Sequence, residues 1–197
     1  MSSSLAGVTF IPNQFTFSQS INAACKLKNI TAAMSVLDSM LSKGQMLPPI
    51  TTTSLLINTL ESNGYHEESA KVYDNVISCH LNYNYYDDDE NSQLIMIVDL
   101  HGLSISLARS AIRSALYSMR SNYFNKDNKN PNRSLVIITG IGKNSKEWLE
   151  PVLKPSVQSW LESDFSPPLV ASELADNLGR LIVPFKMIES WILTEKA

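Results

Sequence analysis

Asp99 and His101, separated by a single residue, are the side chains of this sequence best suited to do chemistry. They follow the apolar run Leu94–Val98, and a glycine-rich segment, residues 139–143, follows a second apolar run, Leu135–Ile138. Short apolar runs of this kind predict buried strands. Because side chains alternate along a strand, Asp99 and His101 are expected on the same face at the strand end. The sequence therefore predicts a carboxylate, an imidazole and a glycine turn at one edge of a sheet, where open α/β folds place their ligands.

These groups are suited to phosphodiester cleavage. A histidine exchanges protons near neutral pH, so His101 can serve as general base or acid, with Asp99 orienting it or holding a divalent ion. The backbone N–H groups of Gly140 and Gly142 can approach a phosphate closely, and Lys143 adds a mobile positive charge. A structural role is the alternative: Asp99 would cap backbone amides of a turn, and His101 would be hydrogen-bonded beneath the glycine loop. The residues alone leave both alternatives open and specify no cofactor.

Charge is distributed unevenly along the chain. Residues 1–93 carry a net charge of −5 and residues 94–197 a net charge of +2. The positive half contains the glycine motif, which favours a phosphate-bearing partner there. His66 and His80 are interpreted as solvated surface residues, and Cys25 and Cys79 lack the spacing of metal ligands. The predicted nucleic-acid contacts are Thr139, Gly140, Gly142, Lys143, Ser145, Lys146, Lys126, Lys129 and Arg133.

Predicted strands and helices alternate in the second half. An apolar stripe after Ser104 predicts a helix between the two strands, whose opposite face carries Arg109, Arg113 and Arg120. Two strands joined through a helix are expected to be parallel, with a right-handed connection. The predicted elements are a strand at 94–100, a helix at 104–121, a strand at 134–139, a helix at 149–163, short strands at 169–171 and 181–183, and a last helix from Pro184 to Leu193.

The two motifs, in this order, resemble those of the small MutS-related (Smr) domain, which is known by an Asp-x-His-Gly motif followed by a Thr-Gly-x-Gly motif. The resemblance runs from Leu94 to Leu193. It includes residues 153–157, which look like the family's second helix, and Asn177-Leu178-Gly179-Arg180, which resembles the tail of a long form found in organellar proteins. The resemblance implies nicking or RNA endonuclease activity, with Asp99 and His101 as the catalytic pair. It also implies a plastid or a mitochondrion as the location.

The first half contains an internal repeat. Residues 16–44 can be laid over residues 52–80 with a shift of 36 residues, and the apolar positions within each copy follow helical spacing. Breaks at Lys28-Asn29 and Asn63-Gly64 divide each copy into two helices. A period of this length with two helices per unit is typical of a helical solenoid.

Two repeat families share this period. Tetratricopeptide units carry a tryptophan and a tyrosine in the first helix, and neither residue occurs in the first helix of either copy. The openings Thr16-Phe17-Ser18 and Thr52-Thr53-Ser54 instead resemble pentatricopeptide repeats. In that family a polar residue early in the first helix, here Ser18 or Ser54, and one at the repeat junction read a single RNA base. The junction positions fall near Pro49 and Asn84, and Pro49 cannot donate a side-chain hydrogen bond. Two units therefore either serve as a docking remnant or continue upstream in a longer chain.

We predict an α plus α/β architecture, in which helical-hairpin repeats precede a compact βαβ-type Smr domain. The acidic run Asp87–Glu90 is expected to be a solvated linker because like charges repel, and it lacks the glycine and distant glutamate of a calcium loop. The predicted boundaries are an N-terminal segment at 1–15, repeats at 16–82, a linker at 83–93 and the Smr domain at 94–197.

The predicted function is RNA binding, with the Smr domain gripping phosphates, the repeats docking the substrate, and RNA cleavage as the activity that the resemblance adds. A non-catalytic adaptor for nucleic acid or protein, and a DNA-nicking endonuclease, are the alternatives. The repeat half favours RNA over DNA. A divalent metal is compatible with Asp99, and no membrane is expected as a partner, because no apolar run approaches the roughly 18 residues needed to span one. Nothing in the sequence indicates an oligomeric state.

Overall fold

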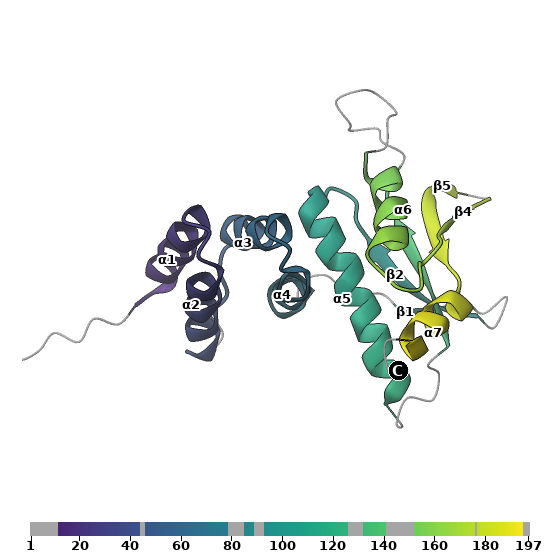
Figure 1. The fold of residues 1–197 in the computed structure, drawn as a ribbon, viewed down its shortest axis with the longest axis horizontal. Coiled ribbons are helices and arrows are strands. Elements are labelled where there is room, and N and C mark those ends of the chain that lie inside the picture. Colours follow the sequence, from purple (N-terminus) through teal and green to yellow (C-terminus); the bar gives the residue numbers. More distant parts are fainter. Residues whose placement is uncertain are drawn as a thin grey trace, which may run out of the picture.

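A helical N-terminal half is followed by a half built on a five-stranded sheet (Figure 1). This computed structural model describes residues 12–43, 46–78, 85–88, 93–125, 132–140, 152–175 and 177–194. The elements in chain order are α1 (Gln14–Lys26), α2 (Ile30–Ser42), α3 (Ile50–Ser62), α4 (His66–Val72), the π-helix η1 (Tyr73–Ser78), β1 (Tyr85–Asp88), β2 (Gln93–Asp99), α5 (Ile105–Phe124), β3 (Arg133–Ile138), α6 (Leu153–Ser163), β4 (Ser172–Leu174), β5 (Asn177–Val183) and α7 (Phe185–Thr194).

The helical half consists of two successive hairpins. Asn13 and Asn29 cap α1 and α2, because their side-chain oxygens accept the backbone N–H groups of Thr16 and Ala32, each at 3.0 Å. The bounds of α3 lie 36 residues after those of α1, and α4 with η1 spans the residues that lie 36 after α2. The four helices expected between residues 16 and 80 are therefore present, and the described residues of this range contain no strand.

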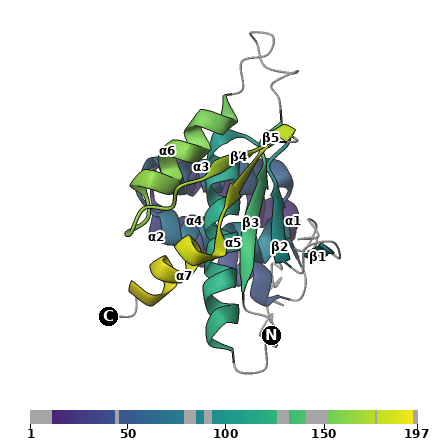
Figure 2. The same ribbon diagram turned by 90° about the vertical axis from the view of Figure 1, so that its right-hand side faces the viewer.

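The sheet has the strand order β1-β2-β3-β5-β4. Strands β2 and β3 are parallel, as predicted, and the other neighbours are antiparallel. Alternate residues of the three central strands are buried beneath the helices: Met96, Val98, Leu135, Ile137, Leu181 and Val183. The intervening residues lie on the opposite face of the sheet, which we call the outer face. In Figure 2 strands β3 and β5 lie toward the viewer, and α5 lies behind them.

Helix α5 lies between the sheet and the helical half (Figure 1). One side packs on β2 and α6, and the other side packs on α3, α4 and η1. Three serines at four-residue spacing lie on the second side. The hydroxyl of Ser106 donates to Asn58, that of Ser110 to Glu61 and that of Ser114 to Asp74, at 2.8, 3.2 and 3.2 Å. The buried hydrophobic residues of both halves, from Phe17 to Ile192, form one core cluster.

The linker predicted between the repeats and the Smr domain implies two units with separate cores, whereas the structure has one hydrophobic core cluster with residues from both halves. The serines and arginines of α5 suggest a solvated face, because these residue types are mostly exposed in proteins. Ser110, Arg113 and Ser114 are nevertheless buried, since α3, η1 and the segment after α6 supply polar partners for them. Small serine side chains also allow the helices to approach closely. The polar face of α5 is a helix–helix interface.

The acidic stretch also differs from its prediction as a linker. Residues 85–88 form β1, which pairs antiparallel with β2 from Tyr85 opposite Met96 to Asp88 opposite Gln93. An edge strand can carry charged residues, because one of its sides is not covered by another strand. Two smaller shifts concern the short strands, which lie at 172–174 and 177–183 rather than 169–171 and 181–183. The domain boundaries themselves stay a prediction.

Candidate nucleic-acid-binding rim of the sheet

Asp99 closes the turn between β2 and α5. Its Oδ1 accepts the backbone N–H of His101 at 2.9 Å, which is the local side-chain bond that Asp favours in turns. Gly102 follows with φ of +77°, a conformation that glycine adopts without steric cost. Leu103 then donates its N–H to the Leu100 carbonyl at 3.0 Å, and Ser104 caps α5. This motif has a structural task, as the structural alternative expected.

The end of β3 lies beside this turn. Asp99 pairs with Ile138 in the parallel register, and the N–H of Leu100 donates to the Ile138 carbonyl at 2.9 Å. Two residues further on, Gly140 has φ of +74°. The N–H groups of Thr139 and Gly140 both donate to the Gly179 carbonyl, at 2.9 and 3.2 Å. The Thr139 hydroxyl donates to the same carbonyl at 3.2 Å. Both motifs and the beginning of β5 therefore meet at one rim of the sheet.

The side chains of Asp99 and His101 are both exposed at this rim, and Asp99 lies on the outer face. Asp99 lies between buried Val98 and Leu100, so its side chain leaves the sheet on the side away from α5. His101 lies in the turn that follows β2, and its side chain is exposed. Within the described residues the imidazole of His101 makes no hydrogen bond and is available to a ligand. The alternative in which His101 is hydrogen-bonded beneath the glycine loop is not what the described part of the chain shows.

The remaining predicted contacts divide into two groups. Arg133 begins β3, whereas Gly140 follows its other end, which separates the two by roughly 20 Å along the strand. The structure therefore does not bring Arg133 to the rim. The other positions lie outside the described residues: Gly142, Lys143, Ser145, Lys146, Lys126 and Lys129.

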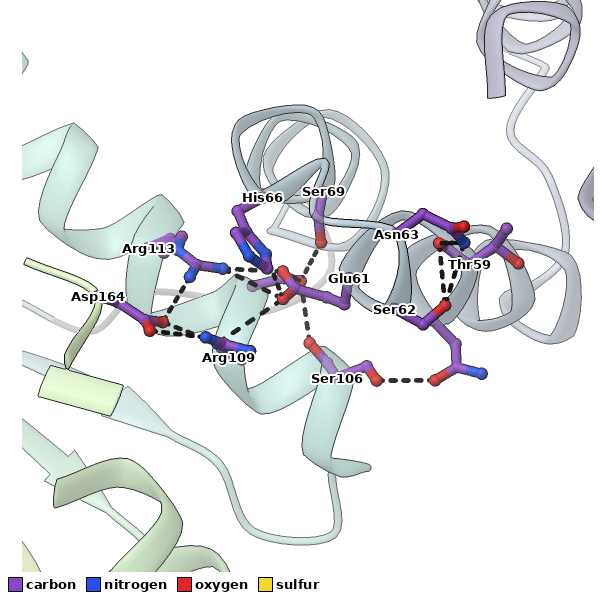
Figure 3. A network of polar contacts seen from close by, with 12 residues as sticks. Thr59, Glu61, Ser62, Asn63, His66, Ser69, Ser106, Arg109, Arg113 and Asp164 are labelled. Carbon is purple, nitrogen blue, oxygen red and sulfur yellow. Dashed lines mark hydrogen bonds and ion pairs between the residues drawn. The ribbon is translucent and has the colours of Figure 1, made fainter. Parts of the chain in front are cut away.

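Arg109 and Arg113, on the polar face of α5, form ion pairs with Glu61 and Asp164 (Figure 3). Arg109 forms two bonds to Asp164, at 2.6 and 2.7 Å, and Arg113 bridges Asp164 and Glu61. Burial raises the pKa of the Asp164 carboxyl, but its hydrogen bond to Arg109 and the charges of both arginines outweigh burial and hold this pKa below its ordinary value. The bond to Asp164 likewise raises the pKa of Arg109. These arginines are therefore structural.

Arg120, the third arginine of this face, lies over the rings of Tyr117 and Trp191, at 4.9 and 5.5 Å from the ring centroids. The side chain of His66 is 35% exposed and its Nδ1 lies 2.9 Å from Glu61, so His66 is paired rather than simply solvated as expected, and His80 lies outside the described residues. Burial raises the pKa of the Cys25 thiol, which keeps it in the unreactive protonated form.

Across the described ranges no three His, Cys, Asp or Glu residues converge as metal ligands, and no helix is long and apolar enough to cross a membrane.

Residues 98–178 match the family model of the Smr domain. The C-terminal half of the chain thus contains an Smr domain. The match begins at the last residues of β2 and ends in β5, so it includes both motifs of the rim. It covers less than half of the chain and leaves the helical half outside. No curated protein and no solved structure gave a match. An Smr domain is a nuclease-like domain that binds nucleic acid, and both motifs lie within the matched residues.

Sequence reasoning gave no role to the first residues of β5. The Gly179 carbonyl accepts the backbone N–H groups of Thr139 and Gly140. The N–H of Gly179 donates to Oδ1 of Asn177 at 3.0 Å. Lys154 donates to the Leu178 carbonyl at 2.8 Å, which fastens α6 to the same rim. The quartet Asn177-Leu178-Gly179-Arg180 was visible as a resemblance, but only the antiparallel pairing with β3 places it beside the two motifs.

Proposed function

We propose that this protein binds RNA through backbone phosphates at the rim and cleaves it there, with His101 as the catalytic residue. The observation that carries the proposal is the exposure of Asp99 and His101 at the same rim as Gly140, within an Smr domain. An exposed imidazole can take a proton from the nucleophile as it attacks the phosphorus, while the P–O bond to the next nucleotide breaks and the departing ribose oxygen takes a proton from solvent. For RNA this nucleophile is either the adjacent 2′-hydroxyl or a water molecule.

Asp99 is proposed to position His101 rather than to touch substrate. Its Oδ1 is engaged by the backbone N–H of His101, which fixes the turn that presents the imidazole. Gly140 supports the site by its left-handed backbone, a conformation that glycine adopts without strain. Lys143 and Lys146 are proposed to contact phosphate, because a lysine neutralises phosphate without reading the base.

RNA rather than DNA is proposed because the helical half is similar to pentatricopeptide repeats. The offset of 36 residues between the helix bounds of the two hairpins supports this assignment. Ser18 does not support base reading, since it is buried and donates its hydroxyl to the Gln14 carbonyl at 2.7 Å. The helical half is therefore proposed to hold and extend the Smr domain rather than to specify a sequence. An organellar location follows from the same two resemblances and is part of the proposal.

The test is a nuclease assay with single-stranded RNA, duplex RNA and supercoiled DNA side by side. We expect cleavage of RNA by the wild-type protein and loss of cleavage in His101→Ala, with affinity for RNA within a few fold of wild type. Cleavage of DNA alone would favour the DNA-nicking alternative. Unchanged cleavage by His101→Ala would refute its role as proton acceptor.

A non-catalytic adaptor is the second candidate, and one observation favours it. The carboxylate of Asp99 is used to build the turn, which is a sufficient structural reason for the motif. An adaptor would bind RNA with the same salt dependence but would release no product in any of the three assays.

A further inference from the structure

Three residues from three strands form a row across the outer face at the rim. Asp99 of β2 pairs with Ile138 of β3, and Ile138 pairs with Arg180 of β5. Residues paired in this way point to the same face of a sheet, and neighbouring strands lie about 4.8 Å apart. The Cα atoms of Asp99 and Arg180 are thus separated by about 10 Å, with Ile138 between them.

The burial of its neighbours fixes the direction of Arg180. Gly179 and Leu181 are buried on the helix side, whereas Arg180 is partly exposed, so the guanidinium leaves on the outer face, as the side chain of Asp99 does. Within the described residues Arg180 forms no ion pair and donates no side-chain hydrogen bond. Arg109 and Arg113, in contrast, form ion pairs with Glu61 and Asp164. Arg180 is therefore a guanidinium at the rim with its donors still available.

The surface around Arg180 suits the less polar parts of a nucleotide. In the next row inward, Ile97 and Ile182 are partly exposed and lie on either side of Val136, which is buried. Leu178, two residues before Arg180 on β5, is 65% exposed. An exposed cation beside an apolar floor and a large exposed side chain is a suitable contact for one nucleotide, with the phosphate on the arginine and the sugar or base on the aliphatic groups.

We infer that Arg180 binds a backbone phosphate of the RNA, so that the strand crosses the rim over Ile138 between Arg180 and the Asp99–His101 turn. This inference rests on the proposed function and adds to it a substrate-binding residue from β5. The guanidinium presents donors in a planar fork that matches two phosphate oxygens. Arg180 holds the strand near the exposed His101.

The experiment measures binding of a labelled single-stranded RNA oligonucleotide at several salt concentrations for the wild-type chain, Arg180→Ala and Arg180→Lys. Arg180→Ala is expected to weaken binding about tenfold at low salt and to reduce the slope of log affinity against log salt by about 0.7, the contribution of one phosphate contact to a single strand. Arg180→Lys keeps the charge and the slope but loses the bidentate geometry, so it is expected to bind two- to fivefold more weakly.

Lys186→Ala is the matched control, because Lys186 is an exposed cation on α7, beyond the opposite end of β5. It should leave affinity and slope unchanged, and thermal melting should show all variants folded. An unchanged slope in Arg180→Ala, or an equal loss in Lys186→Ala, would overturn the inference. If Arg180→Ala weakens RNA binding and reduces the salt slope while the wild-type protein cleaves no RNA, the cleavage proposal fails and the Arg180 binding site stands. A wild-type chain that binds no RNA overturns both.

Discussion

At the residue scale, the Asp-x-His-Gly motif has a structural task, which the geometry of the turn shows, and a chemical task, which we propose. Asp99 holds the His101 N–H, and Gly102 turns the chain into α5, so the motif builds the corner that presents His101. A structural task does not compete with a chemical one when the exposed imidazole makes no other bond within the described residues. Substitutions at Asp99 and at the glycines can separate the two tasks.

Asp99→Asn and Asp99→Ala distinguish the acceptor from the charge. The asparagine keeps an oxygen that can accept the His101 N–H, whereas alanine removes it. We expect Asp99→Ala to lower the free energy of unfolding by about 1 kcal/mol, the typical value of such a bond, and Asp99→Asn to lower it by less than half of that. Urea unfolding measures both. Equal losses in the two variants would show that the bond to His101 does not stabilise the turn.

Gly140→Ala tests the turn after β3. Its φ of +74° costs a residue with a side chain about 1–2 kcal/mol, and an added Cβ would meet nothing within 4 Å, so strain is the whole effect. Gly64→Ala is the matched control, since its φ of +82° and its open surroundings are alike but it lies in the helical half. Both variants should lose similar stability by urea unfolding, and only Gly140→Ala should weaken RNA binding. Weaker binding in both would assign the effect to stability alone.

At the element scale, α5 joins the two halves through buried charges. Glu61 and Arg113 are each about 5% exposed at the side chain, and Asp164 is 8% exposed. Removing one partner of a buried ion pair leaves the other charge uncompensated, which costs about 3–5 kcal/mol. We therefore expect Arg113→Met to lower the free energy of unfolding by about that amount, measured by urea denaturation. Lys71→Met, at an exposed cation of α4, should change it by less than about 0.5 kcal/mol.

The Asp164 carboxyl gives this network an acid dependence. Its pKa is lowered in the folded protein, so the charged form stabilises the fold at any pH above the ordinary value for aspartate, about 3.9. This contribution is lost as the pH falls from there through the lowered pKa. Asp164→Asn should therefore be less stable than the wild type at pH 7, and the difference should shrink below about pH 4. A difference that stays constant down to pH 2 would contradict the role of the charge.

The elements were predictable to the extent that one local signal defined them. The apolar runs predicted β2 and β3, the helical spacing predicted the four N-terminal helices, and Ser104 predicted the start of α5. The packing of α5 was not predictable, because Ser106, Ser110 and Ser114 have the composition of a solvated face and only their partners on α3 and η1 bury them. Arg180 was missed for a related reason. Its place beside Asp99 depends on strand pairing between segments far apart in the sequence.

At the scale of the whole molecule, the two halves depend on each other unequally. Stacked helical repeats need about three units or a capping element, and the helical half has two hairpins. Helix α5 covers the open side of α3 and α4, where a third unit would begin. Without α5 this side of the helical half would be exposed, and Glu61 would lose its ion pairs with Arg109 and Arg113. The Smr domain would instead expose serines and retain Asp164 as a partner for Arg109 and Arg113.

We therefore expect residues 84–197 to fold alone and residues 12–83 not to. Thermal melting followed by circular dichroism should show a cooperative transition for the Smr fragment at a lower temperature than the whole chain, since Arg113 loses Glu61. The helical fragment should show weak helicity and no cooperative transition. Mixing the two fragments should restore helicity in proportion to complex formation, because α5 then supplies the missing packing surface. Arg113→Met in the Smr fragment is the control and should abolish most of that recovery. A helical fragment that melts cooperatively on its own would show that its two hairpins need no cap, and that α5 contributes position rather than stability.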